Sequence, residues 1–216
     1  MRELTIERIL SDKVIAIVRG LSPNALLDLA GALVAGGINL IEITFDQSNP
    51  ESWIDTCVGI RMLNDEFKGK VLAGAGTVLT VEQAARAYDA GAKYLISPDA
   101  NPLVIKKTRE LGIVSIPGCM TPTDIASAMQ AGADFIKIFP AGALGVDYIR
   151  AIRAPLSHAK MLAVGGIDEK NAADFIRAGC LGIGVGGKLV NKDLIAAKKF
   201  DQITEIAKAH VAAVSR

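Results

Sequence analysis

Short apolar segments and helical patterns alternate along nearly the whole chain. Apolar runs of about four to six residues, typical of strands buried on both faces, occur within KVIAIVRG, VAGGINLIEIT, KVLAGAGT, DAGAKYLISP, ELGIVSIPG, QAGADFIKIFP, KMLAVGGI and RAGCLGIGVGG. Amphipathic patterns typical of helices separate these runs at residues 23–35, 50–67, 80–90, 101–111, 121–131, 145–153, 170–178 and 192–215. This alternation predicts an α/β fold built on a parallel sheet.

The number of strand–helix units indicates how the sheet is closed. About eight units in a chain of 216 residues fit a (β/α)8 TIM barrel. The charged segment MRELTIERILSDK precedes the first strand, and we expect it to form an N-terminal helix. A doubly wound open sheet is the alternative, but no G-x-G-x-x-G motif follows the first strand. We therefore expect a single barrel domain over residues 1–216.

Charge and cysteine content restrict the partners and the setting. The chain has 24 basic and 23 acidic residues, a net charge of +1 and no long charge run, which argues against nucleic acid and membrane surfaces. No apolar run reaches the roughly 18 residues of a membrane span, and the charged start does not fit a signal peptide. The three cysteines match no disulfide or metal spacing. We expect a cytoplasmic protein that needs no cofactor and no metal, with both histidines, His158 and His210, in solvent.

Candidate functional residues lie at the strand ends, where barrel enzymes gather their chemistry. Polar side chains occupy four such positions: Arg19 after the first strand, Glu42 in the second, Thr77 at the end of the third and Lys137 in the sixth. The seventh and eighth strands end in the glycine pairs Gly165-Gly166 and Gly186-Gly187.

The alternation of side chains places two of these residues inside the barrel. Lys137 and Glu42 each stand between two isoleucines in an apolar strand. The outward face of a barrel strand must be apolar to contact helices, so the isoleucines point outward and the charged side chains inward. A buried ion pair that only fixes the core is the alternative reading, although such pairs add little net stability.

An amine in an apolar strand has a definite chemical use. Loss of hydration disfavours its charged form and leaves free amine near neutral pH, and a free amine forms a Schiff base with a carbonyl substrate. Glu42 is the strand carboxylate placed for the proton transfers, and Arg19 could hold a substrate carboxylate. The glycine pairs expose backbone N–H groups where many barrels hold phosphate. Taken singly, Arg19 could instead cap a helix, and Thr77 and the glycine pairs could form plain turns.

The ordered motifs resemble one known family. The segments AGGINLIEIT, GAGTVLT, ISPDANP, IPGCMTPTDI, ADFIKIFPA and VGGI are similar to those of the class I 2-keto-3-deoxy-6-phosphogluconate (KDPG) / 4-hydroxy-2-oxoglutarate (KHG) aldolases. The resemblance covers almost the whole chain. It implies a cytoplasmic homotrimer of (β/α)8 subunits in Entner-Doudoroff-type carbohydrate metabolism, cleaving a 2-keto acid to pyruvate plus glyceraldehyde 3-phosphate or glyoxylate.

The resemblance also implies roles for individual residues. Lys137 is similar to the family's Schiff-base lysine and Glu42 to its general acid/base. The expected substrate contacts are Arg19 and Thr77 at the pyruvyl carboxylate, Pro98 and Phe139 around the imine, and Gly165, Gly166, Gly186 and Gly187 around a phosphate.

The chain departs from the gluconate-type pattern at three positions. Asp46 stands where many members have a carboxylate-binding arginine, Val164 replaces a threonine as in the related 6-phosphogalactonate aldolases, and Gly187 replaces a serine, with Lys188 nearby. These differences leave two alternatives open. One is a 2-keto-3-deoxy-6-phosphogalactonate aldolase, and the other is a phosphosugar-binding barrel without turnover. A metal-dependent aldolase is disfavoured, because the strand ends offer few clustered ligands.

Overall fold

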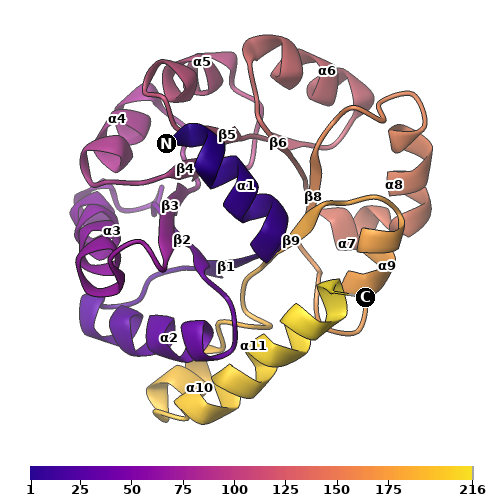
Figure 1. The fold of residues 1–216 in the computed structure, drawn as a ribbon. Helices are drawn as coiled ribbons and strands as arrows, with labels where there is room; N and C mark the ends of the chain where they lie inside the picture. The colour runs from indigo at the N-terminus through magenta and orange to yellow at the C-terminus, as the bar shows by residue number, and fades with distance from the viewer. Residues whose placement is uncertain (216) are drawn as a thin grey trace.

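A computed structural model describes residues 1–215 and shows a nearly closed ring of parallel strands with helices outside it (Figure 1). The strands are β1 (Val14–Val18), β2 (Leu40–Thr44), β3 (Leu72–Gly76), β4 (Tyr94–Ile96), β5 (Val114–Ile116), β6 (Gly118–Cys119), β7 (Ile136–Ile138), β8 (Met161–Val164) and β9 (Gly182–Val185). They are hydrogen-bonded in the order β5-β4-β3-β2-β1-β9-β8-β7-β6. No helix separates β5 from β6, so the nine strands make eight strand–helix units. The (β/α)8 barrel expected from the sequence is therefore confirmed.

Apart from α1, which precedes β1, the helices follow the strands as expected and cover the outside of the ring. They are α1 (Arg2–Asp12), α2 (Pro23–Ala35), the short 3₁₀ helix η1 (Pro50–Ser52), α3 (Trp53–Phe67), α4 (Val81–Asp89), α5 (Pro102–Glu110), α6 (Pro122–Ala131), α7 (Ala141–Leu144), α8 (Val146–Arg153), α9 (Ala172–Arg177), α10 (Lys192–Ala196) and α11 (Phe200–Val214). Side-chain caps fix several starts, such as the reciprocal Thr80–Gln83 and Thr121–Asp124 capping boxes of α4 and α6.

The structure corrects the predicted elements in three places. Pro117 divides the predicted fifth strand into β5 and β6, because proline has no N–H to donate to the ladder. The predicted helix over 192–215 is two helices, separated near Lys198, which has a left-handed φ of 54°. The short helix α7, directly after β7, was not predicted.

The barrel has an inner and an outer apolar core. The inner core contains Ile15, Leu40, Tyr94, Ile96, Val114, Ile116, Phe135 and Leu162, all fully or nearly fully buried. Ile9 of α1 packs into the same cluster, and α1 lies across the centre of the ring in Figure 1. Helix α1 therefore closes one end of the barrel with apolar side chains.

The position of α1 is fixed by a buried carboxylate just before β7. Arg2 and Arg109 both form ion pairs with Asp134, whose side chain is 4% exposed. Asp134 also accepts the backbone N–H of Ser115, at 3.0 Å. One acidic side chain thus links α1, α5, β5 and the segment that leads into β7.

No helix within residues 1–215 is long and apolar enough to cross a membrane.

The two histidines differ in exposure. The expectation of a solvated His210 is wrong: its side chain is 0% exposed, and its Nδ1 lies 2.8 Å from the carbonyl oxygen of Ile206. His158 is exposed, as expected.

Replacing Asp134 with alanine should destabilise the fold. The change leaves Arg2 and Arg109 without their shared partner and the N–H of Ser115 without its acceptor, and we expect the free energy of unfolding to fall by about 3 kcal/mol. Urea denaturation at a fixed protein concentration measures this loss. Asp147→Ala is the matched control, because its pair with Arg150 is exposed and should contribute less than about 1 kcal/mol. Equal effects of the two changes would contradict the linking role of Asp134.

Candidate active site

Lys137 and Glu42 are both buried inside the barrel, as the alternation of side chains predicts. Lys137 on β7 is 4% exposed and Glu42 on β2 is 1% exposed, while their isoleucine neighbours belong to the outer core. Among the described residues, no N–O distance of 4.0 Å or less joins the two side chains, and neither oxygen of Glu42 has a hydrogen-bond partner. The two groups therefore share a space without forming the direct ion pair that a purely structural role requires.

Burial moves the acid–base equilibria of both groups toward their neutral forms. It lowers the pKa of Lys137, an effect that the negative charge of Glu42 opposes and the positive charge of Arg19 reinforces. Burial likewise raises the pKa of Glu42, and the charges of Lys137 and Arg19 oppose that rise. A larger fraction of free amine is therefore available for nucleophilic attack, close to a carboxyl group that can give or take a proton.

Glycines of β3 provide the room that Glu42 needs. Glu42 pairs in register with Gly74 of the neighbouring strand, and its carboxyl group lies over Gly76. A Cβ atom at Gly76 would stand 1.6 Å from Oε1 of Glu42. Even alanine at position 76 would therefore displace the carboxyl group.

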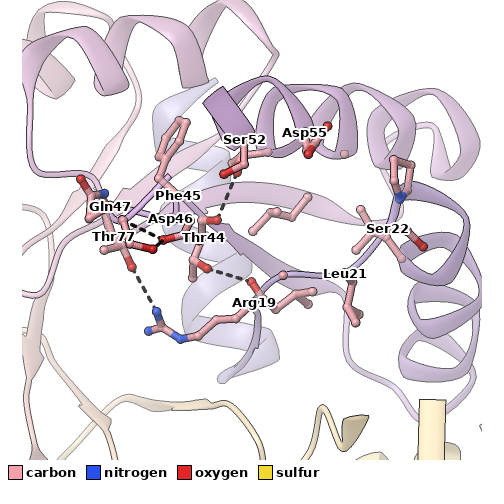
Figure 2. A pocket seen from close by; sticks show the side chains of 18 of the residues that line it. Arg19, Leu21, Ser22, Thr44, Phe45, Asp46, Gln47, Ser52, Asp55 and Thr77 are labelled. Atoms are coloured by element: carbon pink, nitrogen blue, oxygen red, sulfur yellow. Dashed lines mark hydrogen bonds between the residues drawn. The ribbon is translucent and has the colours of Figure 1, made fainter. Parts of the chain in front are cut away.

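Arg19 and Thr77 meet at the carboxyl ends of β1 and β3. Nη1 of Arg19 donates a hydrogen bond to Oγ1 of Thr77 at 3.4 Å, and the carbonyl oxygen of Thr77 accepts one from Nε2 of Gln47 at 2.7 Å (Figure 2). Thr77 holds a left-handed φ of 55°, which is uncommon for a β-branched residue. The guanidinium group and this hydroxyl are thus presented together, as two donors suited to a carboxylate.

A cavity of about 770 Å³ opens beside Arg19 and Thr77, between the β1–α2 and β2–α3 loops (Figure 2). Asp46, Gln47 and Lys192 also line it, whereas Lys137 and Glu42 lie outside it. Arg19 therefore lines the cavity and also acts through its positive charge on both buried groups. Lys192, from the start of α10, adds a second cation near Arg19 that the sequence analysis did not identify.

Phe139 connects the amine to the first glycine pair. The Nζ of Lys137 lies 4.8 Å from the centre of the Phe139 ring, and that ring lies 3.0 Å from where a Cβ of Gly165 would be. Gly165 in turn accepts a 2.7 Å hydrogen bond from the N–H of Gly142 in α7, and Gly166 lies against Gly142. The aromatic ring thus lies between Lys137 and the end of β8.

The second glycine pair faces open space. A Cβ atom at Gly186 or Gly187 would meet no heavy atom within 4 Å. A ligand group can therefore approach the backbone after β9 closely. Pro98 is exposed at the end of β4, and its carbonyl oxygen lies 2.4 Å from where a Cβ of Gly118 would be.

The structure gives Asp46 a local role. Its Oδ1 accepts hydrogen bonds from the N–H and the hydroxyl of Ser48, at 2.9 and 2.6 Å. These bonds lower the pKa of the Asp46 carboxyl, and its carbonyl oxygen accepts a 2.8 Å bond from Nε1 of Trp53. Asp46 therefore organises the β2–α3 loop at the edge of the cavity.

The motifs in the sequence did not indicate four residues that surround the site: Gly74, Gly76, Tyr94 and Gln47. The first two had a readable signal, since LAGAG places glycine at successive inward positions of β3. Tyr94 and Gln47 had none, because their neighbours are distant in the chain.

The chain has relatives of known name over nearly its full length. A sequence model of the family "KDPG and KHG aldolase" matches residues 5–206. The chain is 35% identical to 2-dehydro-3-deoxy-6-phosphogalactonate aldolase of Escherichia coli (strain K12) over 201 residues, 93% of this chain and 95% of the relative. It is 39% identical to a probable 2-dehydro-3-deoxy-6-phosphogalactonate aldolase of Rhizobium meliloti (strain 1021) over 183 residues, 84% of each chain.

A solved structure agrees with the sequence relatives. The KDPG aldolase from Legionella pneumophila, with pyruvate captured at low pH as a covalent carbinolamine intermediate, is 27% identical. It superposes with a TM-score of 0.85 over 95% of this chain and 97% of that chain. The barrel and the sequence motifs thus lead to one conclusion: the chain belongs to the KDPG and KHG aldolase family.

Proposed function

We propose that this protein is a class I aldolase that uses Lys137 to form a Schiff base with a 2-keto-3-deoxy-6-phospho sugar acid. The observation that carries the proposal is the buried amine of Lys137, which shares the barrel interior with the buried carboxyl group of Glu42. The carbinolamine in the Legionella pneumophila relative supports the same chemistry.

In the proposed reaction, the free amine of Lys137 attacks the C2 carbonyl carbon to form a carbinolamine. The protonated carboxyl group of Glu42 gives its proton to the departing hydroxyl group, which leaves as water, so the step ends with a protonated imine and the carboxylate of Glu42. The carboxylate of Glu42 takes the proton of the C4 hydroxyl, the C3–C4 bond breaks, and its electron pair moves into the imine to form an enamine. Glyceraldehyde 3-phosphate leaves. A proton then returns to C3, and hydrolysis of the imine releases pyruvate and the free amine.

The remaining predicted residues would hold the two ends of the substrate. Arg19 and Thr77 would bind the carboxylate next to the reacting carbonyl, since they already present two donors side by side. Pro98 and Phe139 would bound the imine. The N–H groups at Gly165, Gly166, Gly186 and Gly187 would bracket the phosphate, and the open space at the last two supports this assignment.

Between the two epimeric substrates, the proposal favours 2-keto-3-deoxy-6-phosphogalactonate. Two relatives of that name align with most of this chain. Two positions also differ from the gluconate-type pattern. Val164 at the end of β8 is 6% exposed, and Asp46 accepts a hydrogen bond from Ser48 within its own loop. The gluconate epimer and 4-hydroxy-2-oxoglutarate are the alternative substrates.

We also propose that the active protein is a homotrimer in the cytoplasm. The three cysteines are buried free thiols, in keeping with a reducing setting. Large apolar side chains are exposed near the starts of successive helices, after the carboxyl ends of the strands: Ile54, Val81, Leu103 and Met120. Contact between copies would cover them.

Lys137 should be trapped by borohydride in the presence of pyruvate. Reduction of the imine gives a stable adduct that peptide mass spectrometry locates on Lys137, and Lys137→Ala should reduce pyruvate release at least about a thousandfold with the fold intact. Lys160→Arg is the control, because Lys160 is an exposed lysine just before β8 and should leave the adduct unchanged. An unmodified Lys137 peptide, or turnover that survives Lys137→Ala, would overturn the proposal. Phosphate analogues that bind without any turnover would identify a binding protein instead.

The substrate preference should be visible in kcat/KM. A lactate dehydrogenase-coupled pyruvate assay should give the highest value for the galactonate epimer, and Val164→Thr should shift the ratio toward the gluconate epimer by about tenfold, since the site gains one hydroxyl group. The control Val211→Thr, at a half-buried position of α11, should leave the ratio unchanged. A wild-type preference for the gluconate epimer or for 4-hydroxy-2-oxoglutarate would refute this choice of substrate.

The trimer should be visible in the mass of the protein. Sedimentation equilibrium should give three times the chain mass of 22.7 kDa. The double variant Ile54→Asp, Leu103→Asp should dissociate, because charges placed in an apolar contact must be desolvated. Monomeric wild-type protein would contradict the assembly, while leaving the chemistry at Lys137 untouched.

A further inference from the structure

Tyr94 is a buried polar side chain to which neither the fold nor the proposed reaction assigns a role. Its side chain is 0% exposed within the inner core, and among the described residues its hydroxyl group has no hydrogen-bond partner. A buried hydroxyl group without a partner typically costs about 1–3 kcal/mol. An apolar side chain could fill this position without that cost, so the hydroxyl group needs an explanation.

The geometry of β3 places Tyr94 beside Glu42. The Tyr94 ring lies over Gly74, where a Cβ atom would be 2.2 Å from Cε2 and 2.5 Å from Cζ. The Glu42 carboxyl group lies over Gly76, two residues further along the same strand. Gly74 is also the register partner of Glu42. The two side chains thus enter from strands on either side of β3 and occupy adjacent spaces above its two glycines.

The polar atoms of both side chains lack protein partners. Neither Glu42 oxygen is hydrogen-bonded among the described residues, and the same holds for the Tyr94 hydroxyl group. Burial, together with the negative charge of Glu42, raises the pKa of Tyr94 well above its ordinary value. The phenol therefore keeps its proton and remains a hydrogen-bond donor throughout the working pH range.

We propose that Tyr94 is a positioning residue for Glu42, whose hydroxyl group donates a hydrogen bond to the Glu42 carboxylate across one water molecule in the barrel interior. The catalytic part of this assignment rests on the proposed function. A donor aimed at a carboxylate favours its ionised form, which is the form that removes the C4 hydroxyl proton. Tyr94 thereby opposes the effect of burial and holds the carboxyl group toward the reacting atoms.

The other groups that act on Glu42 differ from Tyr94 in charge. Lys137 from β7 and Arg19 after β1 both favour the carboxylate through their positive charges. An iminium formed on Lys137 keeps that charge, but the free amine has none. The neutral phenol donates at every stage, so it sustains the basicity of Glu42 when the lysine is uncharged.

The decisive test titrates Glu42 without any substrate. Carbon-13 NMR of protein labelled at the glutamate carboxyl carbons follows the titration, and Glu42→Gln identifies the signal. In Tyr94→Phe the midpoint should move to higher pH by about one unit, because the ionised form loses a donor. Tyr88→Phe makes the same change at an exposed tyrosine of α4 and should leave the midpoint in place.

A midpoint that does not move in Tyr94→Phe overturns the proposal. A rise in melting temperature without that movement also overturns it, since that pair of results marks a hydroxyl group that is only buried. These readouts are independent of the aldolase proposal, which stands or falls with the trapping of pyruvate on Lys137.

Kinetics test the consequence for turnover. The acidic limb of the kcat/KM profile should move to higher pH in Tyr94→Phe, while borohydride trapping on Lys137 stays at the wild-type level. A profile that does not move, or a loss of trapping in this variant, would refute the assignment of Tyr94 to Glu42.

Discussion

The shielding of the barrel interior from bulk solvent is the constraint on which the candidate site depends. An amine and a carboxyl group enclosed by aromatic and aliphatic side chains are both driven toward neutrality, and each is restored in part by the other's charge. This balance holds only while the interior stays closed on the side away from the strand ends. Helix α1 provides that closure, with Ile9 in contact with the inner core. The chemistry at one end of the barrel thus depends on packing at the other.

The glycines of β3 are a second requirement. A closed barrel has a crowded interior, and two functional side chains of the size of glutamate and tyrosine fit only where a neighbouring strand gives up its own side chains. Gly74 and Gly76 do this at adjacent inward positions. The lack of side chains at Gly74 and Gly76 is therefore a condition for the polar groups beside β3.

The barrel and the central pair of residues were predictable because they follow from local rules. A two-residue period along an apolar strand is enough to point Lys137 and Glu42 inward, and the alternation of apolar runs with amphipathic segments is enough to count the strand–helix units. The contacts of Tyr94 and Gln47 were not predictable, since they join residues far apart in the chain. His210 shows a third case, because its spacing from Ile203, Ala207 and Val214 matches the buried face of α11. The polar character of histidine concealed a signal that was present in the pattern.

The carboxylate of Asp134 stands three residues before Lys137 and binds an arginine at the very start of the chain. The strand that carries the amine is consequently tethered to the N-terminal segment. A purification tag attached at the N-terminus can therefore affect the chemistry of Lys137. An extension or truncation that frees the first turn of α1 would let solvent enter the barrel at the end that α1 closes. Hydration would then raise the pKa of Lys137 and leave less free amine to react.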